Sequence, residues 1–507
     1  MFDTPFNLLL NHTGHMSPYL ILAVITATYL GFKIVRSLHD AYFGPLSKFP
    51  GPKLRALSKW PSNITVIRGS EGVELPALHE QYGPVVRIGP KELSYAGGAA
   101  SWRGIYGFRK SGDAHPAKLE KDYAKPLNRV DGIFTADDAN HGRQRKILSH
   151  SFADKTLKDF EPMLKLWVGK LTDRIADESG EEVDLLKYYN CTTFDIMGDL
   201  TFGEDLHMLE TGEYNDWVKA IFQGIKSGTI IRGVKHLSAI SEWVVNRFVV
   251  YNPKVRTATA EHWKLSKDRV DRRLARTDER RDLWTKILAK SNTPEALTYD
   301  EHHSNAAIFM VAGTETTAAA LAGTTYWLLR NPDCLNKLTS EIRDAFANAA
   351  EITLDSVQRL QYLQAVLQEG LRMYPPVPSK LPREVPAGGT MIDGELIPEH
   401  TSVGVHQLST YRLESNFKDA YEFHPERWLG DERYANDHLD ALEAFSVGPR
   451  SCIGKNLAWH EMRLILTNIL FHFDLQLSKE SIDWHDQKIY TIWEKRPLLV
   501  RAVPRSS

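Results

Sequence analysis

A cysteine in the C-terminal part of the chain lies among residues that suit a metal-bound thiolate. The chain has three cysteines, and Cys452 follows Gly448 and Arg450 and precedes Gly454 in the segment FSVGPRSCIG. Glycines let backbone N–H groups approach a sulfur closely, and a helix that begins after the cysteine turns the positive end of its dipole toward it. The pattern KNLAWHE from Lys455 predicts such a helix. We therefore expect Cys452 to be an ionised metal ligand rather than a buried thiol that packs as a small hydrophobe.

An Ala-rich helical stretch places an acid and an alcohol next to each other. Residues 312–317 read AGTETT, so Glu315 precedes Thr316, and Thr316 lies one helical turn after Ala312. A carboxyl and a hydroxyl can relay protons, and Gly313 leaves room for a small ligand. The alternative is a small-residue helix interface in which Thr316 bonds its own helix backbone. Together with a metal-binding cysteine, the acid–alcohol pair favours oxygen activation.

These segments resemble the sequence motifs of the cytochrome P450 family. Cys452 lies in the ligand-loop pattern FxxGxRxCxG, residues 312–317 match AGxETT, and residues 369–372 match ExxR. Segments such as HEQYGPVVRIGPKELSY from His79 are similar to fungal members that act in secondary metabolism. The resemblance implies a mainly α fold with small β-sheets (α+β), preceded by a single N-terminal transmembrane helix.

The resemblance also implies a haem b cofactor and a role for each matching residue. Cys452 would be the axial thiolate to the haem iron. The residues around the cofactor would be Phe445 and Gly454 beside the ligand, with Arg450, Arg145, His141 and Arg383 toward the propionates; His141 stands where the family often has Trp. The catalytic residues would be Gly313, Glu315 and Thr316, and a buried charge cluster behind the ligand loop would contain Glu369, Arg372 and Arg427.

The function implied is that of a monooxygenase, which inserts one oxygen atom from O2 into an apolar small molecule by hydroxylation, epoxidation or multi-step oxidation. The similarity to fungal members of the family favours a terpenoid or polyketide intermediate as the substrate. Electrons would come from NADPH through a separate NADPH-cytochrome P450 reductase, with cytochrome b5 as a further candidate donor. Phe108, Phe222 and Phe309 are candidate pocket residues. Two alternatives stay open: a haem-thiolate isomerase or dehydratase that works without O2, and a non-catalytic haem-binding scaffold.

The N-terminal residues predict a membrane anchor. The apolar stretch from Pro18, PYLILAVITATYLGFKIV, is near the lower limit of the about 17 to 25 residues that span a bilayer. Lys33 and Arg36 close it on the C-terminal side, and the preceding residues contain no Lys or Arg, so the body should lie in the cytosol on an endoplasmic reticulum membrane. The predicted segments are a lumenal N-terminus (1–17) with Asn11 as a candidate glycosylation site, a transmembrane signal-anchor (18–36), a proline-rich hinge (37–55) and the haem-thiolate domain (56–507).

The overall charge argues against nucleic acid as a partner. The 507 residues contain 62 basic and 64 acidic side chains, a formal net charge of −2, which does not provide the basic surface that phosphate backbones require. Long helical patterns dominate the chain, and two shorter zones rich in β-forming residues interrupt them. One is a strand pair within 85–96 with a turn at Gly89 and Pro90, and the other covers 375–405.

Overall fold

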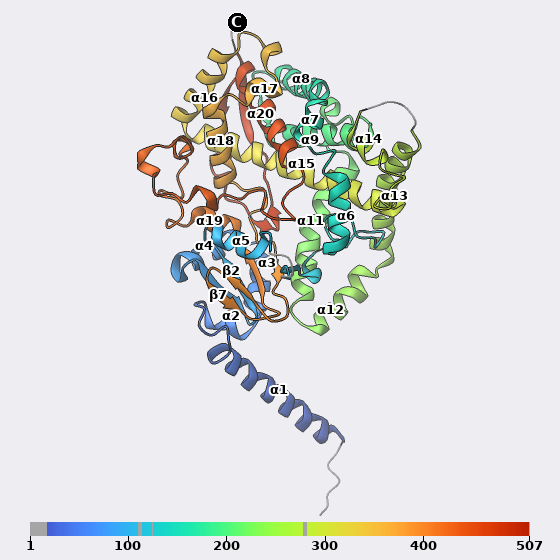
Figure 1. Ribbon diagram of the computed structural model, residues 1–507, viewed down its shortest axis with the longest axis vertical. Coiled ribbons are helices and arrows are strands. Elements are labelled where there is room, and N and C mark those ends of the chain that lie inside the picture. The colour runs from blue at the N-terminus through green and yellow to red at the C-terminus, as the bar shows by residue number, and fades with distance from the viewer. Residues whose placement is uncertain (1–17, 110–113, 124, 277–280, 506–507) are drawn as a thin grey trace, which may run out of the picture.

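The longest helix, α15 (Tyr299–Arg330), crosses the middle of the molecule (Figure 1). It begins with a capping box, in which Thr298 and Glu301 each accept a hydrogen bond from the other's backbone, and it ends before Pro332. We describe a computed structural model that places residues 18–109, 114–123, 125–276 and 281–505. Most of the described chain is helical and the sheets are small, so the predicted fold class is confirmed.

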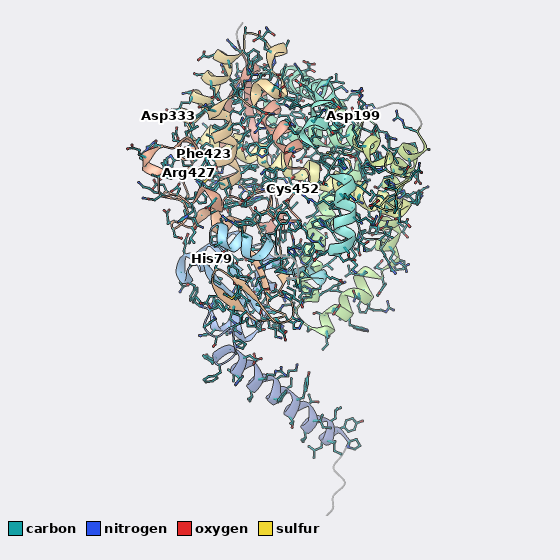
Figure 2. All side chains as sticks on the ribbon, viewed as in Figure 1. His79, Asp199, Asp333, Phe423, Arg427 and Cys452 are labelled. Atoms are coloured by element: carbon teal, nitrogen blue, oxygen red, sulfur yellow. The ribbon has the colours of Figure 1, made fainter. Side chains whose placement is uncertain are left out.

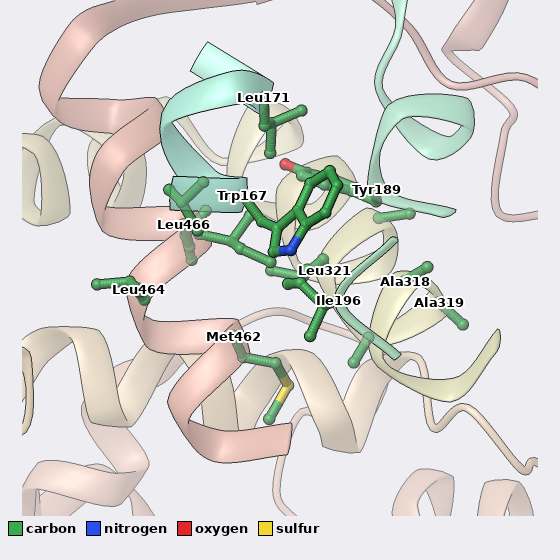
Figure 3. Packing of buried hydrophobic residues seen from close by; sticks show 14 of the residues in the cluster. Trp167, Leu171, Tyr189, Ile196, Ala318, Ala319, Leu321, Met462, Leu464 and Leu466 are labelled. Carbon is green, nitrogen blue, oxygen red and sulfur yellow. The ribbon is translucent and has the colours of Figure 1, made fainter. Parts of the chain in front are cut away.

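The helices that pack most extensively on α15 are α9 (Leu185–Phe202), α18 (Gln361–Met373) and α20 (Lys455–His472). Glycine permits one of these contacts, because a Cβ on Gly370 of α18 would lie 2.9 Å from the Cβ of Thr324. The core between the helices is apolar, and Figure 3 shows some of its side chains. It includes Trp167, Leu171, Tyr189, Ile196, Ala318, Leu321, Met462, Leu464 and Leu466.

The other helices surround this centre. Those before α9 are α2 (Lys53–Leu57), α3 (Trp60–Arg68), α4 (Glu71–Tyr82), α5 (Ala99–Tyr106), α6 (Asp138–Leu148), α7 (Asp154–Lys158) and α8 (Glu161–Asp177). Those between α9 and α15 are α10 (Met208–Thr211), α11 (Asp216–Lys235), α12 (Ala239–Val245), α13 (Pro253–Ala275) and α14 (Leu283–Leu288). After α15 come α16 (Pro332–Ala345), α17 (Leu354–Val357) and α19 (Gln407–Arg412).

The largest sheet combines both predicted β zones. Its strand order is β1-β2-β8-β5-β3, with β1 (Val85–Gly89) and β2 (Glu92–Tyr95) forming the expected antiparallel pair. β2 runs parallel to β8 (Ser402–Val405), and β5 (Arg383–Glu384) pairs with β3 (Ala117–Lys118), so that Lys118 lies opposite Arg383. The smaller sheets contain β4 (Glu182–Asp184), β12 (Leu499–Pro504) and β9 (Phe473–Leu477); β6 (Thr390–Ile392) and β7 (Glu395–Ile397); and β10 (Ile489–Tyr490) and β11 (Ile492–Trp493).

The N-terminal helix α1 (Pro18–Tyr42) projects from one end of the body (Figure 1). Two described helices are long and apolar enough to cross a membrane; most of α15 is buried in the protein, whereas the apolar part of α1 contacts none of it. The helix continues past residue 36 to Tyr42, so the predicted hinge (37–55) contains its last residues and the start of α2. The bounds of the signal-anchor and the hinge stay predictions. No Pro or Gly follows residue 36 until Gly44 and Pro45, so nothing stops the helix earlier. Asn11 lies outside the described residues.

Candidate active site

The segment from Phe445 to Gly454 forms a tight loop that presents Cys452 to a buried cavity of about 300 Å³. The backbone of Gly448 has φ +76°, and a Cβ there would overlap the carbonyl of Tyr106, so only glycine fits. The amide of Cys452 donates to the carbonyl of Phe445 at 2.8 Å and closes the loop. Figure 2 shows Cys452 near the centre of the molecule.

The surroundings of the Cys452 sulfur act on its ionisation in opposite directions. Burial raises the pKa of the thiol, whereas the amides of Gly454 and Lys455, at the start of α20, and the positive charges of Arg145 and Lys455 lower it. A metal cation at the sulfur would act in the same direction as these amides and positive charges: it would lower the pKa of the thiol further and stabilise the thiolate. Cys191 and Cys334 are buried and do not line this cavity. The structure thus supports the choice of Cys452 among the three cysteines.

One face of α15 forms another wall of the same cavity. Its lining residues recur at helical spacing: Ile308, Phe309, Ala312, Gly313, Thr316, Thr317 and Ala320. The hydroxyl of Thr316 donates to the carbonyl of Ala312 at 2.6 Å. The same bond is expected if Thr316 has only a structural role in the helix, so the bond alone does not distinguish the two roles. At Gly313, a Cβ would lie 2.8 Å from the sulfur of Met197, so Met197 already takes the space that we expected the glycine to leave for a ligand.

Glu315 does not line the cavity. Its buried carboxylate forms an ion pair with Lys495, in the segment between β11 and β12, and its second oxygen has no hydrogen-bond partner among the described residues. Burial raises the pKa of Glu315, and Lys495 opposes this effect. The predicted acid and alcohol are therefore adjacent in the chain, but in this structure only the alcohol faces the cavity.

The predicted propionate residues all line the cavity. Arg145 donates to the carbonyl of Ser451 at 2.6 Å, and Arg450 donates to Asp138 at 2.7 Å and to the carbonyl of Ala136. His141 lies one turn before Arg145 on α6, as the sequence predicted, and burial lowers its pKa to about 4. The fourth of these residues is Arg383 of β5. Phe445 and Gly454, which the sequence placed beside the ligand, line the cavity as well.

Lys118 and Tyr123 also line the cavity, and our reading of the sequence missed both. Burial, followed by the nearby charges of Arg383 and Arg450, lowers the pKa of Lys118 to about 6. Neither residue belongs to a recognisable motif. Lys118 is brought to the cavity only by the pairing of β3 with β5, a long-range contact that local sequence patterns do not reveal.

Four cationic side chains lie around the cavity and would suit an anionic bound group. Lys118, Arg145, Arg383 and Arg450 all lie around it, and one guanidinium nitrogen on each of Arg383 and Arg450 is buried without a hydrogen-bond partner among the described residues. Buried cationic donors without acceptors are costly, so this edge fits carboxylates of a bound group. A haem supplies two propionates at one edge and an iron for the thiolate. The residues present therefore fit a haem.

A second cluster of charges is buried outside the lining of the cavity. Glu369, Arg372 and Arg427 are fully buried, and Glu369 accepts hydrogen bonds from Arg372 at 2.7 Å and from Arg427 at 3.1 Å. Burial favours the neutral form of Glu369, but the two arginines hold its pKa below the ordinary value. Trp428 donates to the same carboxylate at 2.9 Å. The three predicted residues therefore form one cluster: Glu369 and Arg372 lie on α18, and Arg427, labelled in Figure 2, lies on a later segment.

The three predicted aromatic pocket residues differ in position. Phe309 lines the cavity, where its ring lies 5.1 Å from that of Phe152 in an edge-on contact. Phe222 packs against Phe194 and Tyr214 and does not line it. Phe108 is largely exposed and borders a more open cavity beside the ligand loop, which shares Cys452 and Arg450 with the first cavity but does not bring Phe108 to it. Only Phe309 therefore meets the expectation.

Comparison with known proteins identifies the family. The family model for cytochrome P450 matches residues 63–498. The chain is 46% identical to the cytochrome P450 monooxygenase efuB of Hormonema carpetanum, over 95% of this chain and 96% of that protein. It is 36% identical to an averantin hydroxylase of Dothistroma septosporum, over 99% of this chain and 96% of that protein. The solved haem domain of cytochrome P450DA shares the fold, with a TM-score of 0.63 at 22% identity, covering 74% of this chain and 79% of that one. This chain belongs to the cytochrome P450 family.

Proposed function

We propose that this haem-thiolate monooxygenase inserts one oxygen atom from O2 into an apolar terpenoid or polyketide intermediate of a fungal secondary-metabolite pathway. One observation carries the proposal: Cys452 and the AGTETT face of α15 line one cavity whose other walls are mostly apolar. The relatives include fungal monooxygenases, and one of them is named for the hydroxylation of averantin. Their names support the class of reaction and do not specify this chain's substrate.

Each part of the cavity has a separate task. When bound, the haem supplies the iron at which dioxygen is reduced and split, and thiolate donation favours that cleavage. Cys452 holds the iron, while Lys118, Arg145, Arg383 and Arg450 hold the propionates. Ile133, Phe134, Ile308 and Phe309 surround the substrate, exclude water and orient the carbon to be oxidised.

Protons reach the distal side through this chain's own groups. We assign the Thr316 hydroxyl, at the cavity wall, as the donor nearest the reacting oxygen. Glu315, next to it in the chain, holds the following proton on its buried carboxyl. Because Glu315 is paired with Lys495, proton transfer requires the carboxyl to leave that partner or to exchange protons through water.

The ferrous–CO spectrum tests the iron ligand. The wild-type protein should show the Soret band at the position typical of a thiolate ligand, and Cys452→Ser should lose it. Cys334→Ser is the matched control, because Cys334 is buried away from the cavity and its loss should leave the band unchanged. A band at the histidine-type position in the wild-type protein would contradict the assignment.

Two other activities make different predictions. An isomerase or dehydratase of the same cofactor class needs neither O2 nor electrons, so turnover under strict anaerobiosis without reductant would favour it. A scaffold that only binds haem would give no substrate-induced spin-state change and no NADPH consumption with reductase. The acid–alcohol sequence of Glu315 and Thr316, of which Thr316 lines the cavity, favours the monooxygenase.

We further infer that the protein works on the cytosolic face of the endoplasmic reticulum membrane, where NADPH-cytochrome P450 reductase, with cytochrome b5 as a second donor, supplies electrons. The exposed apolar helix α1 supports an anchor. A patch of exposed apolar side chains on and after α12, here called the α12 patch, lies at the end of the body from which α1 projects (Figure 1). It comprises Ile240, Trp243, Phe248, Val250 and Tyr251. Such a patch suits contact with the same membrane.

A further inference from the structure

Residues 128–136, here called the wall segment, run beside the first turns of α15 and form part of the cavity wall. Two of them, Ile133 and Phe134, line the cavity, and the segment has no regular secondary structure of its own. Its shape therefore depends on side chains that satisfy its backbone groups.

Asn305 supplies the central contact. The side chain is fully buried on α15, and its carbonyl oxygen accepts a hydrogen bond from the amide of Ile133 at 2.8 Å. Its amide nitrogen donates to the side chain of Gln144 and to the carbonyl of Glu301, both at 2.9 Å. A polar side chain that uses both ends in this way fixes the position of Ile133 and cannot be replaced by an apolar residue of similar size.

Gln144 extends the contact to α6, the helix that carries His141 and Arg145. It too is fully buried, and its amide nitrogen donates to the carbonyl of Asp131 at 3.0 Å and to the carboxylate of Glu301 at 3.1 Å. Asn305 and Gln144 therefore hold the wall segment on both sides of Gly132.

The wall segment lies very close to α15 at Gly132. A Cβ at this residue would stand 3.1 Å from the side-chain oxygen of Asn305 and 3.2 Å from the backbone of Ser304. The hydroxyl of Ser304 donates to the carbonyl of Val130 at 2.8 Å, which adds a second anchor one residue from Asn305. A methyl group at this point would therefore require the segment or the helix to shift.

The C-terminal end of the wall segment accepts hydrogen bonds from two of the four cationic side chains around the cavity. Lys118 donates to the carbonyl of Phe134, and Arg450 donates to the carbonyl of Ala136 at 2.7 Å. Ile133 and Phe134 thus stand between the Asn305 anchor and two cations at the cavity edge. Loss of the anchor should let these two side chains move without displacing Cys452.

We propose that Asn305 and Gln144 are specificity-determining positioning residues, which fix Ile133 and Phe134 and so set the length and shape of apolar substrate that the cavity accepts. The inference rests on the proposed function, because it takes this cavity as the substrate pocket. Neither residue lines the cavity, so both act through the wall segment rather than by touching the substrate.

Imidazoles that bind the ferric iron and carry alkyl tails test the proposal without the native substrate. We would measure dissociation constants for 1-methylimidazole and 1-octylimidazole from the Soret shift. In Asn305→Ala the short ligand should bind within about twofold of wild type, whereas the octyl-to-methyl affinity ratio should change by about fivefold or more, since each misplaced CH2 contact is worth up to ~0.8 kcal/mol. Asn190→Ala is the matched control: Asn190 is equally buried but bonds Tyr214, and its loss should leave the ratio unchanged.

Hydrogen exchange gives a readout that does not depend on ligand binding. Peptides covering 128–136 should exchange about tenfold faster in Asn305→Ala than in wild type, with other segments unaffected. If Asn305→Ala retains no haem, Gly132→Ala serves in its place, because the added methyl group must push the segment off Asn305. An unchanged affinity ratio together with unchanged exchange would overturn the proposal. A wild-type spectrum without a thiolate signature would instead overturn the proposed function.

Discussion

Lys495 forms an ion pair with Glu315 inside the protein, where the two side chains are 7% and 4% exposed. The pair joins the middle of α15 to the segment between β11 and β12, which is about 180 residues away in the chain. Burial disfavours the charged form of Glu315, and Lys495 is the charge that opposes this effect. The carboxylate next to Thr316 therefore depends on a residue that no sequence motif indicates.

Replacing Lys495 by Met should make stability fall as the pH rises. Without Lys495, the folded-state pKa of Glu315 rises further above its ordinary value of about 4.5. Above a pH of about 4.5, the carboxyl of Glu315 therefore loses its proton in the unfolded chain but keeps it in the folded chain. The free energy of unfolding then declines by up to ~1.4 kcal/mol per pH unit until the folded-state pKa is reached. Urea unfolding at pH 5 and pH 7 should therefore show a larger drop for Lys495→Met than for wild type.

The double variant Glu315→Gln with Lys495→Met is the control for this experiment. Gln carries no charge at any pH, so the additional pH dependence should disappear. If Lys495→Met and wild type show the same difference between pH 5 and pH 7, the ion pair does not stabilise the charged form of Glu315.

Thr316→Ala should uncouple electron use from product formation and leave the fold intact. Among the described residues, its hydroxyl bonds the carbonyl of Ala312 in its own helix and no other group, so removal should change the free energy of unfolding by no more than about 1 kcal/mol. If the hydroxyl also supplies a proton at the cavity, product formed per NADPH should fall about tenfold or more, and Thr316→Ser should restore it. Thr314→Ala is the matched control, because Thr314 makes the same type of bond to Met310 and does not line the cavity. Equal coupling in Thr316→Ala and Thr314→Ala would assign Thr316 a structural role.

The geometry of the local motifs could be predicted from the sequence, because each motif depends on residues close together in the chain. The loop around Cys452 and the cavity face of α15 are examples: glycine positions and helical spacing fix where these side chains point. Lys118 and Lys495 show what local patterns leave out. Each reaches the site through a strand pairing or a buried ion pair between distant segments, and tertiary packing alone determines such contacts.

Glu369→Gln should destabilise the protein strongly. The substitution removes the carboxylate that pairs with Arg372 and Arg427, which are fully buried; Arg427 keeps a second ion pair with Asp437, so Arg372 is the cation left without an acidic partner among the described residues. Breaking such a pair typically costs about 3–5 kcal/mol, because uncompensated charge stays in the interior. Denaturant unfolding and the yield of haem-bound protein should both report the loss. Glu422→Gln is the control, since Glu422 pairs with His424 at the surface and its side chain is 69% exposed. A Glu369→Gln protein within about 1 kcal/mol of wild type would contradict the assigned role.

Lys118→Met should speed the loss of haem. A charge-assisted hydrogen bond to a propionate is worth about 1.5–3 kcal/mol, which corresponds to roughly 10- to 100-fold in the rate of haem transfer to an excess of a haem-scavenging globin. Lys121→Met, on the exposed neighbouring turn, should have no effect.

The pH dependence of haem loss provides a second check on the role of Lys118. A bound propionate raises the pKa of Lys118 from about 6, so haem binding takes up a proton, and wild-type haem loss should quicken between pH 6.5 and 8.5. The Met variant should lack this dependence, and a rate unaffected by the mutation would exclude Lys118 as a propionate partner.

Removal of α1 should weaken membrane binding but not abolish it. The α12 patch exposes Trp243 and Phe248 at the end of the body from which α1 projects, and burial of a large apolar side chain contributes about 1.5–3 kcal/mol. In vesicle flotation, a chain lacking residues 1–43 should therefore remain partly bound, and adding Trp243→Glu and Phe248→Glu should release it. Leu166→Glu is the matched control, because Leu166 is an exposed apolar residue on α8, at the other end of the body in Figure 1. If the truncated chain floats equally well with and without the two Glu substitutions, the α12 patch does not contact the membrane; if truncation alone releases the chain, α1 is the whole attachment.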